Sequence, residues 1–355
     1  MDHRQREFLD ALLETSSPSG FEQPGQQVWI DYVSEFADSV RTDEYGNAVA
    51  ISEGDGDLEV AIAGHADEIG FMVRDVTDDG FLRLTRIGGS DRTVTRGQHV
   101  TVHTSNGPIE GVVGQVAIHL RDKNDEGLSD VSEQHVDIGV EDEAAASDLV
   151  EIGDPVTFSS EMASLAGSRF AARGMDNRVG IWTAGEALRR ASDADGSPTV
   201  YAVSTVQEEV GLSGAKMVGF DLEPDAIVAV DVTHATDSPD VPGKRTTGVK
   251  LGAGPVVARG SANHPKLVEA VRNVAQAESI DVQLQATGIR TGTDADAFYT
   301  QRGGIPSVNV GLPNRYMHTP VEVIDAEDLE AAADLLGAFA TVADEYGPFE
   351  VNLDG

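Results

Sequence analysis

The sequence predicts an α/β fold in which a mixed, helix-flanked sheet carries a small inserted all-β module. Two observations support this prediction. Runs rich in Val, Ile and Ala alternate with helix-like stretches in the first and last parts of the chain, as in layered α/β domains. The middle of the chain has short alternating segments between turn residues, which is typical of a small all-β unit. We therefore expect one domain from residues 1–70 and 165–355, and a second from residues 71–164.

Four apolar runs are the expected strands of the main sheet. They are LEVAIAG (58–64), TVYAVSTV (199–206), AIVAVDVT (226–233) and PSVNVGL (306–312). Because these runs lack strict alternation, we expect both faces of each strand to be buried. Helix-like stretches between them include RVGIWTAGEALRRA, PKLVEAVRNVAQAE and AEDLEAAADLLGAFATVADEY.

The first residues form a helical stripe of Phe8, Leu9, Leu12 and Leu13 with charges between them, which argues against a signal peptide. The inserted module is read from alternating segments such as FLRLTRI, QHVTVHT, GVVGQVAIH and DPVTFSS. Its four histidines, His99, His103, His119 and His135, have no acidic partner at a metal-like spacing. We interpret them as ordinary strand or surface residues.

The composition excludes several classes of function. There are 61 acidic residues against 25 basic ones, for a net charge of −36 spread along the whole chain, and a nucleic-acid backbone would be repelled. No run of about 18 apolar residues exists to span a membrane. With no cysteine, there is neither a thiolate nucleophile nor a sulfur-ligated metal site.

Only five of the 25 basic residues are lysines, and the acidic charge is not confined to a tail. Self-repulsion between so many like charges is screened at high salt. We therefore expect the cytoplasmic protein of a halophile.

Histidines and acids collect just after the carboxyl ends of the four expected strands, where ligands bind in open α/β sheets. They are His65 and Asp67, Glu208 and Glu209, Asp231, and His318, and a further acid, Asp176, opens a helix. Each has a simpler interpretation: Asp176 as a helix N-cap, the histidines as core residues, the two glutamates as a solvated pair. However, burying two adjacent carboxylates without cations is unfavourable, and the seven together favour a metal site.

Five of these residues supply two imidazoles and three carboxylates as candidate ligands: His65, Asp176, Glu209, Asp231 and His318. Such ligands suit zinc, cobalt or manganese. The residues alone do not assign ligands to individual ions.

Six motifs resemble, in order and spacing, those of the M42 (TET) aminopeptidases: GHADEIGFMV, GMDNRVG, QEEVGLSGA, AVDVTHA, GTDADAF and RYMHTPVE. The resemblance covers nearly the whole chain, including the inserted module. It implies a metal-dependent aminopeptidase that removes N-terminal residues from short peptides with a free N-terminus. It also implies that the β module is a barrel-like dimerisation domain, and that dimers build a homododecamer.

By this resemblance each subunit holds two divalent metal ions. Asp176 would bridge both ions, His318 and Glu209 would complete one site, and His65 and Asp231 would divide between the two. The division we expect places His65 and Asp231 on one ion and Glu209 and His318 on the other. Glu208, beside a ligand but free itself, is then the candidate general base that takes a proton from a metal-activated water and delivers it to the leaving amine. Asp67 would orient the His65 imidazole through its other ring nitrogen.

Two further places stay open. Thr293 and Asp294 form either a loop facing the site or a plain helix start, and His264 either touches substrate or precedes the helix that begins at Pro265. The side-chain preference of the substrate pocket cannot be read from the sequence.

Three other functions compete with the peptidase. Glu208, Asp231 and Asp67 could serve a metal-free glycoside hydrolase. The same two-metal site could hydrolyse an acyl group from an amino acid or a sugar. A non-catalytic scaffold with structural cations is the third, although a free Glu208 beside the site argues against it.

Overall fold

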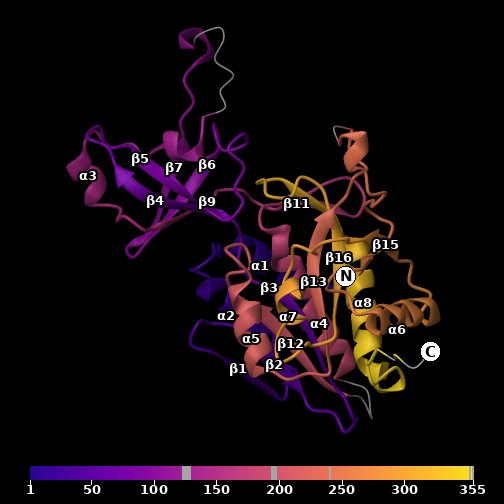
Figure 1. Ribbon diagram of the computed structural model, residues 1–355. Helices are drawn as coiled ribbons and strands as arrows, with labels where there is room; N and C mark the ends of the chain where they lie inside the picture. Colours follow the sequence, from indigo (N-terminus) through magenta and orange to yellow (C-terminus); the bar gives the residue numbers. More distant parts are fainter. Residues whose placement is uncertain (122–128, 193–197, 240, 352, 354–355) are drawn as a thin grey trace.

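An eight-stranded mixed sheet forms the centre of the larger unit in the computed structural model, which describes residues 1–121, 129–192, 198–239, 241–351 and 353 (Figure 1). From edge to edge the strands are β1 (Ser39–Thr42), β2 (Ala48–Ser52), β12 (Thr199–Thr205), β3 (Glu59–His65), β13 (Ala226–His234), β16 (Ser307–Asn314), β14 (Val256–Arg259) and β15 (Gln283–Ala286). The four central strands, β12, β3, β13 and β16, are parallel. They are the four apolar runs of the sequence, so that prediction is confirmed.

Helices cover both faces of this sheet. One face packs against α1 (His3–Glu14), α2 (Gln23–Val33), α4 (Met175–Ala191), α6 (Pro265–Ala277) and α8 (Ala326–Val342). The other face packs against α5 (Ser213–Asp221) and α7 (Ala295–Phe298). Neighbours along a strand enter different layers, since Ile62 joins the first core while Ala61 and Ala63 join the second. Burial on both faces explains why the strands lack alternation.

The start of α4 is shaped by a glycine. Gly174 precedes the helix with φ 66°, and a Cβ at this position would lie 2.0 Å from the Arg178 side chain. A larger residue would therefore be strained in backbone and side chain alike. The helix itself is almost entirely buried, and its second residue is Asp176.

The inserted module is a closed six-stranded barrel set to one side of the α/β unit (Figure 1). Its strands run in the order β4 (Gly70–Val76), β5 (Leu82–Ile87), β8 (His135–Asp137), β7 (Gly107–Val113), β6 (His99–Thr104) and β9 (Pro155–Phe158). Alternate residues such as Leu82, Leu84, Val100 and Val102 fill its core. The predicted all-β module is therefore present, and the exact domain limits at residues 71 and 164 stay a prediction.

Smaller elements complete the chain. They are α3 (Glu143–Ser147), the three-stranded sheet of β10 (Ala163–Ser164), β11 (Arg169–Ala172) and β17 (Glu322–Asp325), and the 3₁₀ turns η1 (Ile118–Leu120), η2 (Val131–Glu133), η3 (Gly243–Arg245) and η4 (Ala343–Glu345). Among the described residues, none of the helices has the length and apolarity needed to cross a bilayer.

The four histidines of the module lie on secondary-structure elements. His99 and His103 are on β6, His119 is in η1 and His135 is on β8. His103 is half-buried, and its Nε2 lies 2.8 Å from the Thr157 hydroxyl. In the described parts of the chain, none of the four joins a group of metal-type donor atoms.

Candidate metal centre

The parallel strands carry the predicted site residues to one edge of the sheet. His65 is the last residue of β3, Asp231 lies near the end of β13, and Glu208 and Glu209 follow β12 by three and four residues. His318 follows β16, and the start of α4 adds Asp176 to the same place. Because the carboxyl ends of neighbouring parallel strands meet at one edge, residues far apart in sequence become neighbours.

Two groups of donor atoms share Asp176. In the first, donor atoms of His65, Asp176 and Asp231 all lie within 4.8 Å of one another, and in the second the same holds for Asp176, Glu209 and His318. The Nε2 atom of His65 is 3.2 Å from Asp176 Oδ1, and that of His318 is 3.3 Å from Asp176 Oδ2. The two oxygens of one carboxylate thus face two different imidazoles.

Glu208 lies beside these two groups and forms a third group of donor atoms with His65 and Glu209. Its Oε2 is 3.8 Å from His65 Nε2, and its side chain lines the same cavity as the candidate ligands. Burial raises the pKa of Glu208 well above its ordinary value, and the nearby carboxylate of Asp231 adds to the effect while His65 opposes it. The group therefore holds a proton more tightly than an exposed glutamate does.

Asp67 is fully buried behind His65. His65 Nδ1, the ring nitrogen that does not face Asp176, lies 3.1 Å from the Asp67 backbone carbonyl and 3.3 Å from the Asp67 carboxylate oxygen Oδ1. The same carboxylate accepts hydrogen bonds from the backbone N–H groups of Glu208 and Glu209, at 2.9 and 3.1 Å, and from the Ser19 hydroxyl at 2.6 Å. Asp67 therefore contacts both an imidazole of the site and the turn that carries the two glutamates.

The centre holds more carboxylates than the chain itself neutralises. Burial raises the pKa of Glu209 to about 7 and that of Asp231 to about 6. Burial alone would lower the pKa of His65, but the surrounding acids, Glu208 foremost, raise it well above its usual value. Within the described residues, the ion-pair partners of these acids are histidines only.

Divalent cations fit this donor set. One buried oxygen of the site, Glu209 Oε1, lies 3.4 Å from His318 Nε2 but accepts no hydrogen bond from the described residues. A buried carboxylate oxygen without a donor is costly, and a cation removes that cost. Imidazole nitrogens and carboxylate oxygens are the ligands that zinc, cobalt and manganese accept.

A cavity of about 820 Å³ opens on these residues. Its other walls are mostly uncharged, with Thr233, Gln285, Asn309 and Met317 among them, and Arg290 adds a cation. The volume lies in the range of cavities that take small ligands. A short peptide can therefore reach the donor atoms.

The structure describes the two segments whose roles the sequence leaves undecided, Thr293 with Asp294 and His264. Thr293 lines the cavity, and Asp294 is the buried residue that precedes α7, with its carboxylate hydrogen-bonded to Thr205. Loop and helix start thus coincide there. His264 is the residue before α6 and is absent from the described lining of the cavity, which favours the helix-start interpretation.

Sequence reasoning missed Glu322. Its carboxyl accepts backbone N–H groups from His318 at 2.8 Å and from Asp176 at 3.2 Å, so it ties together two segments that carry candidate ligands. Burial raises its pKa to about 8. An acid within the apolar segment PVEVID was the available signal, but its partner 146 residues away was not visible.

The chain resembles known aminopeptidases over nearly its full length. The family profile described as M42 glutamyl aminopeptidase matches residues 46–335. A lysyl aminopeptidase of Pyrococcus furiosus is 33% identical over 336 residues, which is 94% of this chain and 95% of the relative.

Solved structures of aminopeptidases share the fold. An aminopeptidase of the archaeon Desulfurococcus kamchatkensis superposes with a TM-score of 0.91 at 32% identity, covering 100% of both chains. The TET1 peptidase of Pyrococcus horikoshii, described as assembling into a tetrahedron or a large octahedral shell, gives 0.84 at 31% identity over 95% of this chain and 99% of that one. Profile, sequence identity and fold agree with the donor groups at the sheet edge, and the chain belongs to the M42 family of metallo-aminopeptidases.

Proposed function

We propose that this enzyme removes N-terminal residues from short peptides and holds two divalent cations per subunit. The observation that carries the proposal is the shared carboxylate of Asp176, whose two oxygens face His65 on one side and His318 on the other. His65 and Asp231 would hold one cation, Glu209 and His318 the other, and Asp176 would bridge them. The two donor groups around Asp176 support this division.

Cations bound there would supply Lewis-acid chemistry, lowering the pKa of a water and polarising the scissile carbonyl group. The chain supplies the proton transfer. Glu208 belongs to neither group around Asp176, although its carboxylate forms a third group with donor atoms of His65 and Glu209, and we assign to it the role of general base. Its carboxyl would take the proton of the attacking water and give it to the leaving amine. Asp67 would hold the His65 ring in place through Nδ1.

The test is hydrolysis of matched free and N-acetylated short peptides in molar salt, before and after chelation, with zinc, cobalt or manganese restored. We expect cleavage of free peptides only, lost on chelation and regained with metal. Cleavage of the acetylated peptides would favour the related acyl hydrolase. Activity that survives chelation would favour a glycosidase-type use of the acids, and inactivity towards every peptide would leave a scaffold.

We also propose self-assembly through the barrel. The segment after β7 extends away from the barrel, and its apolar residues Val116, Ile118 and Leu120 are 57%, 71% and 80% exposed (Figure 1). Exposed apolar patches of this kind mark interaction surfaces. Dimers formed there would build a dodecamer, in keeping with the tetrahedron of the Pyrococcus horikoshii relative. High salt would favour assembly by screening the charge of −36, as expected of a cytoplasmic halophilic enzyme.

A further inference from the structure

Side chains and backbone both hold the turn that presents Glu208 and Glu209. The carbonyls of Val206, Gln207 and Glu208 accept backbone N–H groups of residues 211–214. Four consecutive N–H groups, from Val206 to Glu209, all donate to side-chain oxygens. The acceptors are Asn47 for residue 206, Glu22 for residue 207 and Asp67 for residues 208 and 209. The N–H side of the turn is therefore held by these three acceptors, and its carbonyl side by the backbone.

Gln207 is the point in this turn that most needs support. It has a φ of 56°, the left-handed region that residues with a side chain rarely adopt. Such a conformation persists where surrounding contacts hold it. The contact to its N–H is the Glu22 carboxyl, whose Oε1 lies 3.2 Å away and also accepts the N–H of Gly20 at 2.7 Å.

The segment that carries Glu22 makes three hydrogen bonds to the turn or to residues next to it. Ser19 donates to Asp67, Glu22 accepts from Gln207, and the Gln26 amide donates to the carbonyl of Ser204 at 2.9 Å. Glu22 is 4% exposed, and the charged group that acts on it among the described residues is another acid, Asp67. Burying a carboxyl group without a cation costs free energy unless hydrogen bonds to the carboxyl offset that cost.

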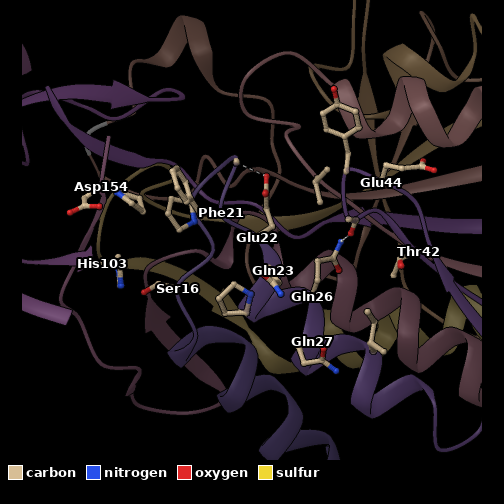
Figure 2. A pocket seen from close by; sticks show the side chains of 18 of the residues that line it. Ser16, Phe21, Glu22, Gln23, Gln26, Gln27, Thr42, Glu44, His103 and Asp154 are labelled. Carbon is tan, nitrogen blue, oxygen red and sulfur yellow. Dashed lines mark hydrogen bonds between the residues drawn. The ribbon is translucent and has the colours of Figure 1, made fainter. Parts of the chain in front are cut away.

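Glu22 reaches the turn from a second cavity of about 800 Å³, distinct from the one that opens on the metal site. Figure 2 shows its side chain among those of Phe21, Gln23 and Gln26, with Glu44 and His103 on other walls. The two cavities share no described lining residue. A substrate at the metal site would therefore not touch Glu22, and any influence on the reaction passes through the turn.

We propose that Glu22 is a positioning residue, which holds Glu208 and Glu209 in their working geometry by accepting the N–H of Gln207. The proposal rests on the proposed two-metal function, since it assigns Glu22 to the turn that carries the base and one ligand. What matters is a side chain long enough to place an acceptor oxygen at Gln207, whether charged or neutral.

Glu22→Gln and Glu22→Asp separate reach from charge. Glutamine keeps the length and an acceptor oxygen, so its kcat should stay within about threefold of wild type. Aspartate keeps the charge but is one methylene short, and its kcat should fall about 10–100-fold with little change in KM, as for other residues that orient ligands. Glu44→Gln is the matched control, because Glu44 is exposed in the same cavity and should change nothing.

Cobalt gives a readout independent of turnover. The visible absorption spectrum and the affinity of bound cobalt should change in Glu22→Asp and stay as in wild type in Glu22→Gln. An inactive wild-type enzyme would refute the proposed function, while the cobalt spectra would still compare the variants. Equal behaviour of the two variants, whether both normal or both impaired, would overturn the role of Glu22. If Glu22→Asp does not fold, Glu22→Gln alone decides, because a loss of kcat or an altered spectrum in it contradicts the proposal.

Discussion

Glu68 and Glu208 occupy equivalent places on neighbouring parallel strands, and the chain treats them in opposite ways. His65 and Thr205 pair at the ends of β3 and β12, and each glutamate follows its strand end by three residues. Glu68 meets two arginines, with Arg173 Nη1 at 2.6 Å and Arg178 Nη2 at 2.8 Å.

Among the described residues, the charged neighbours of the Glu208 carboxyl are a histidine and other acids. Nearby arginines hold the pKa of Glu68 well below its ordinary value against the effect of burial, whereas burial raises the pKa of Glu208. The difference shows that the fold can supply fixed cations for a buried acid at this edge of the sheet. Among the described residues, the donor groups around Asp176 have ion pairs with histidines and none with an arginine or lysine, which is the physical reason to assign those groups to metal ions.

The largest expected effect separates chemistry from structure. Glu208→Gln should lower kcat by about 10²–10⁴-fold, the usual contribution of a general base, because an amide cannot take the proton of water. Metal content measured by elemental analysis should stay near two ions per subunit. The matched control is Glu44→Gln, an exposed change outside the centre, with normal turnover. A Glu208→Gln enzyme that keeps its turnover, or one that loses its metal, would remove Glu208 from the role of base.

A substitution at Glu68, the acid that binds two arginines, should lower the free energy of unfolding. Glu68→Gln leaves two buried guanidinium groups without their carboxylate, and breaking a buried pair in this way costs about 3–5 kcal/mol. Urea unfolding in high salt at neutral pH measures the loss.

The effect of Glu68 should also depend on pH. Because the pKa of Glu68 is lowered by folding, its stabilisation is fully present above the unfolded value of about 4.3 and is lost as the pH falls below it. The stability difference between wild type and Glu68→Gln should therefore shrink in acid. A difference that is constant with pH, or that grows in acid, would contradict the assigned charge state.

Metal ions that bind at the donor groups around Asp176 should stabilise the folded protein. A cation at 100 times its Kd stabilises the folded protein by about 2.7 kcal/mol per site. Thermal unfolding of the chelated protein with and without zinc measures this gain. Asp176→Asn should lose most of it because the shared carboxylate is weakened, while Glu44→Gln should keep it in full. An undiminished gain in Asp176→Asn would mean that the ions bind elsewhere.

Local signals in the sequence sufficed for the strands and for most of the centre. Buried strands read as apolar runs, and the acids and histidines at their ends could be assigned to one edge because parallel strands bring those ends together. The barrel was visible from alternation, but its strand order was not, since β8 lies between β5 and β7.

The contacts that neutralise or brace the site were out of reach of the sequence. Glu68 lies 105 residues from Arg173, and Glu22 lies 185 residues from Gln207. In the sequence, Glu22 reads only as an acid before a helix that has a proline in its first turn. Contacts of this separation are set by how the layers pack, which no local pattern encodes.

Salt should have the smallest effect on Glu68 with its two arginines and on the donor groups around Asp176. Both are buried, so screening with a Debye length of about 3 Å at 1 M should leave them nearly unchanged. The acidic surface should respond strongly, and the sedimentation coefficient should fall as the salt is lowered, because subunits that repel one another separate. Ile118→Asp should cause the same fall at high salt by placing a charge on the exposed segment after β7. Phe220→Asp on α5 should not, although Phe220 is 66% exposed and Ile118 71%. A size that depends on neither salt nor Ile118 would show that assembly uses another surface, and the contrast between the two buried acids would stand without it.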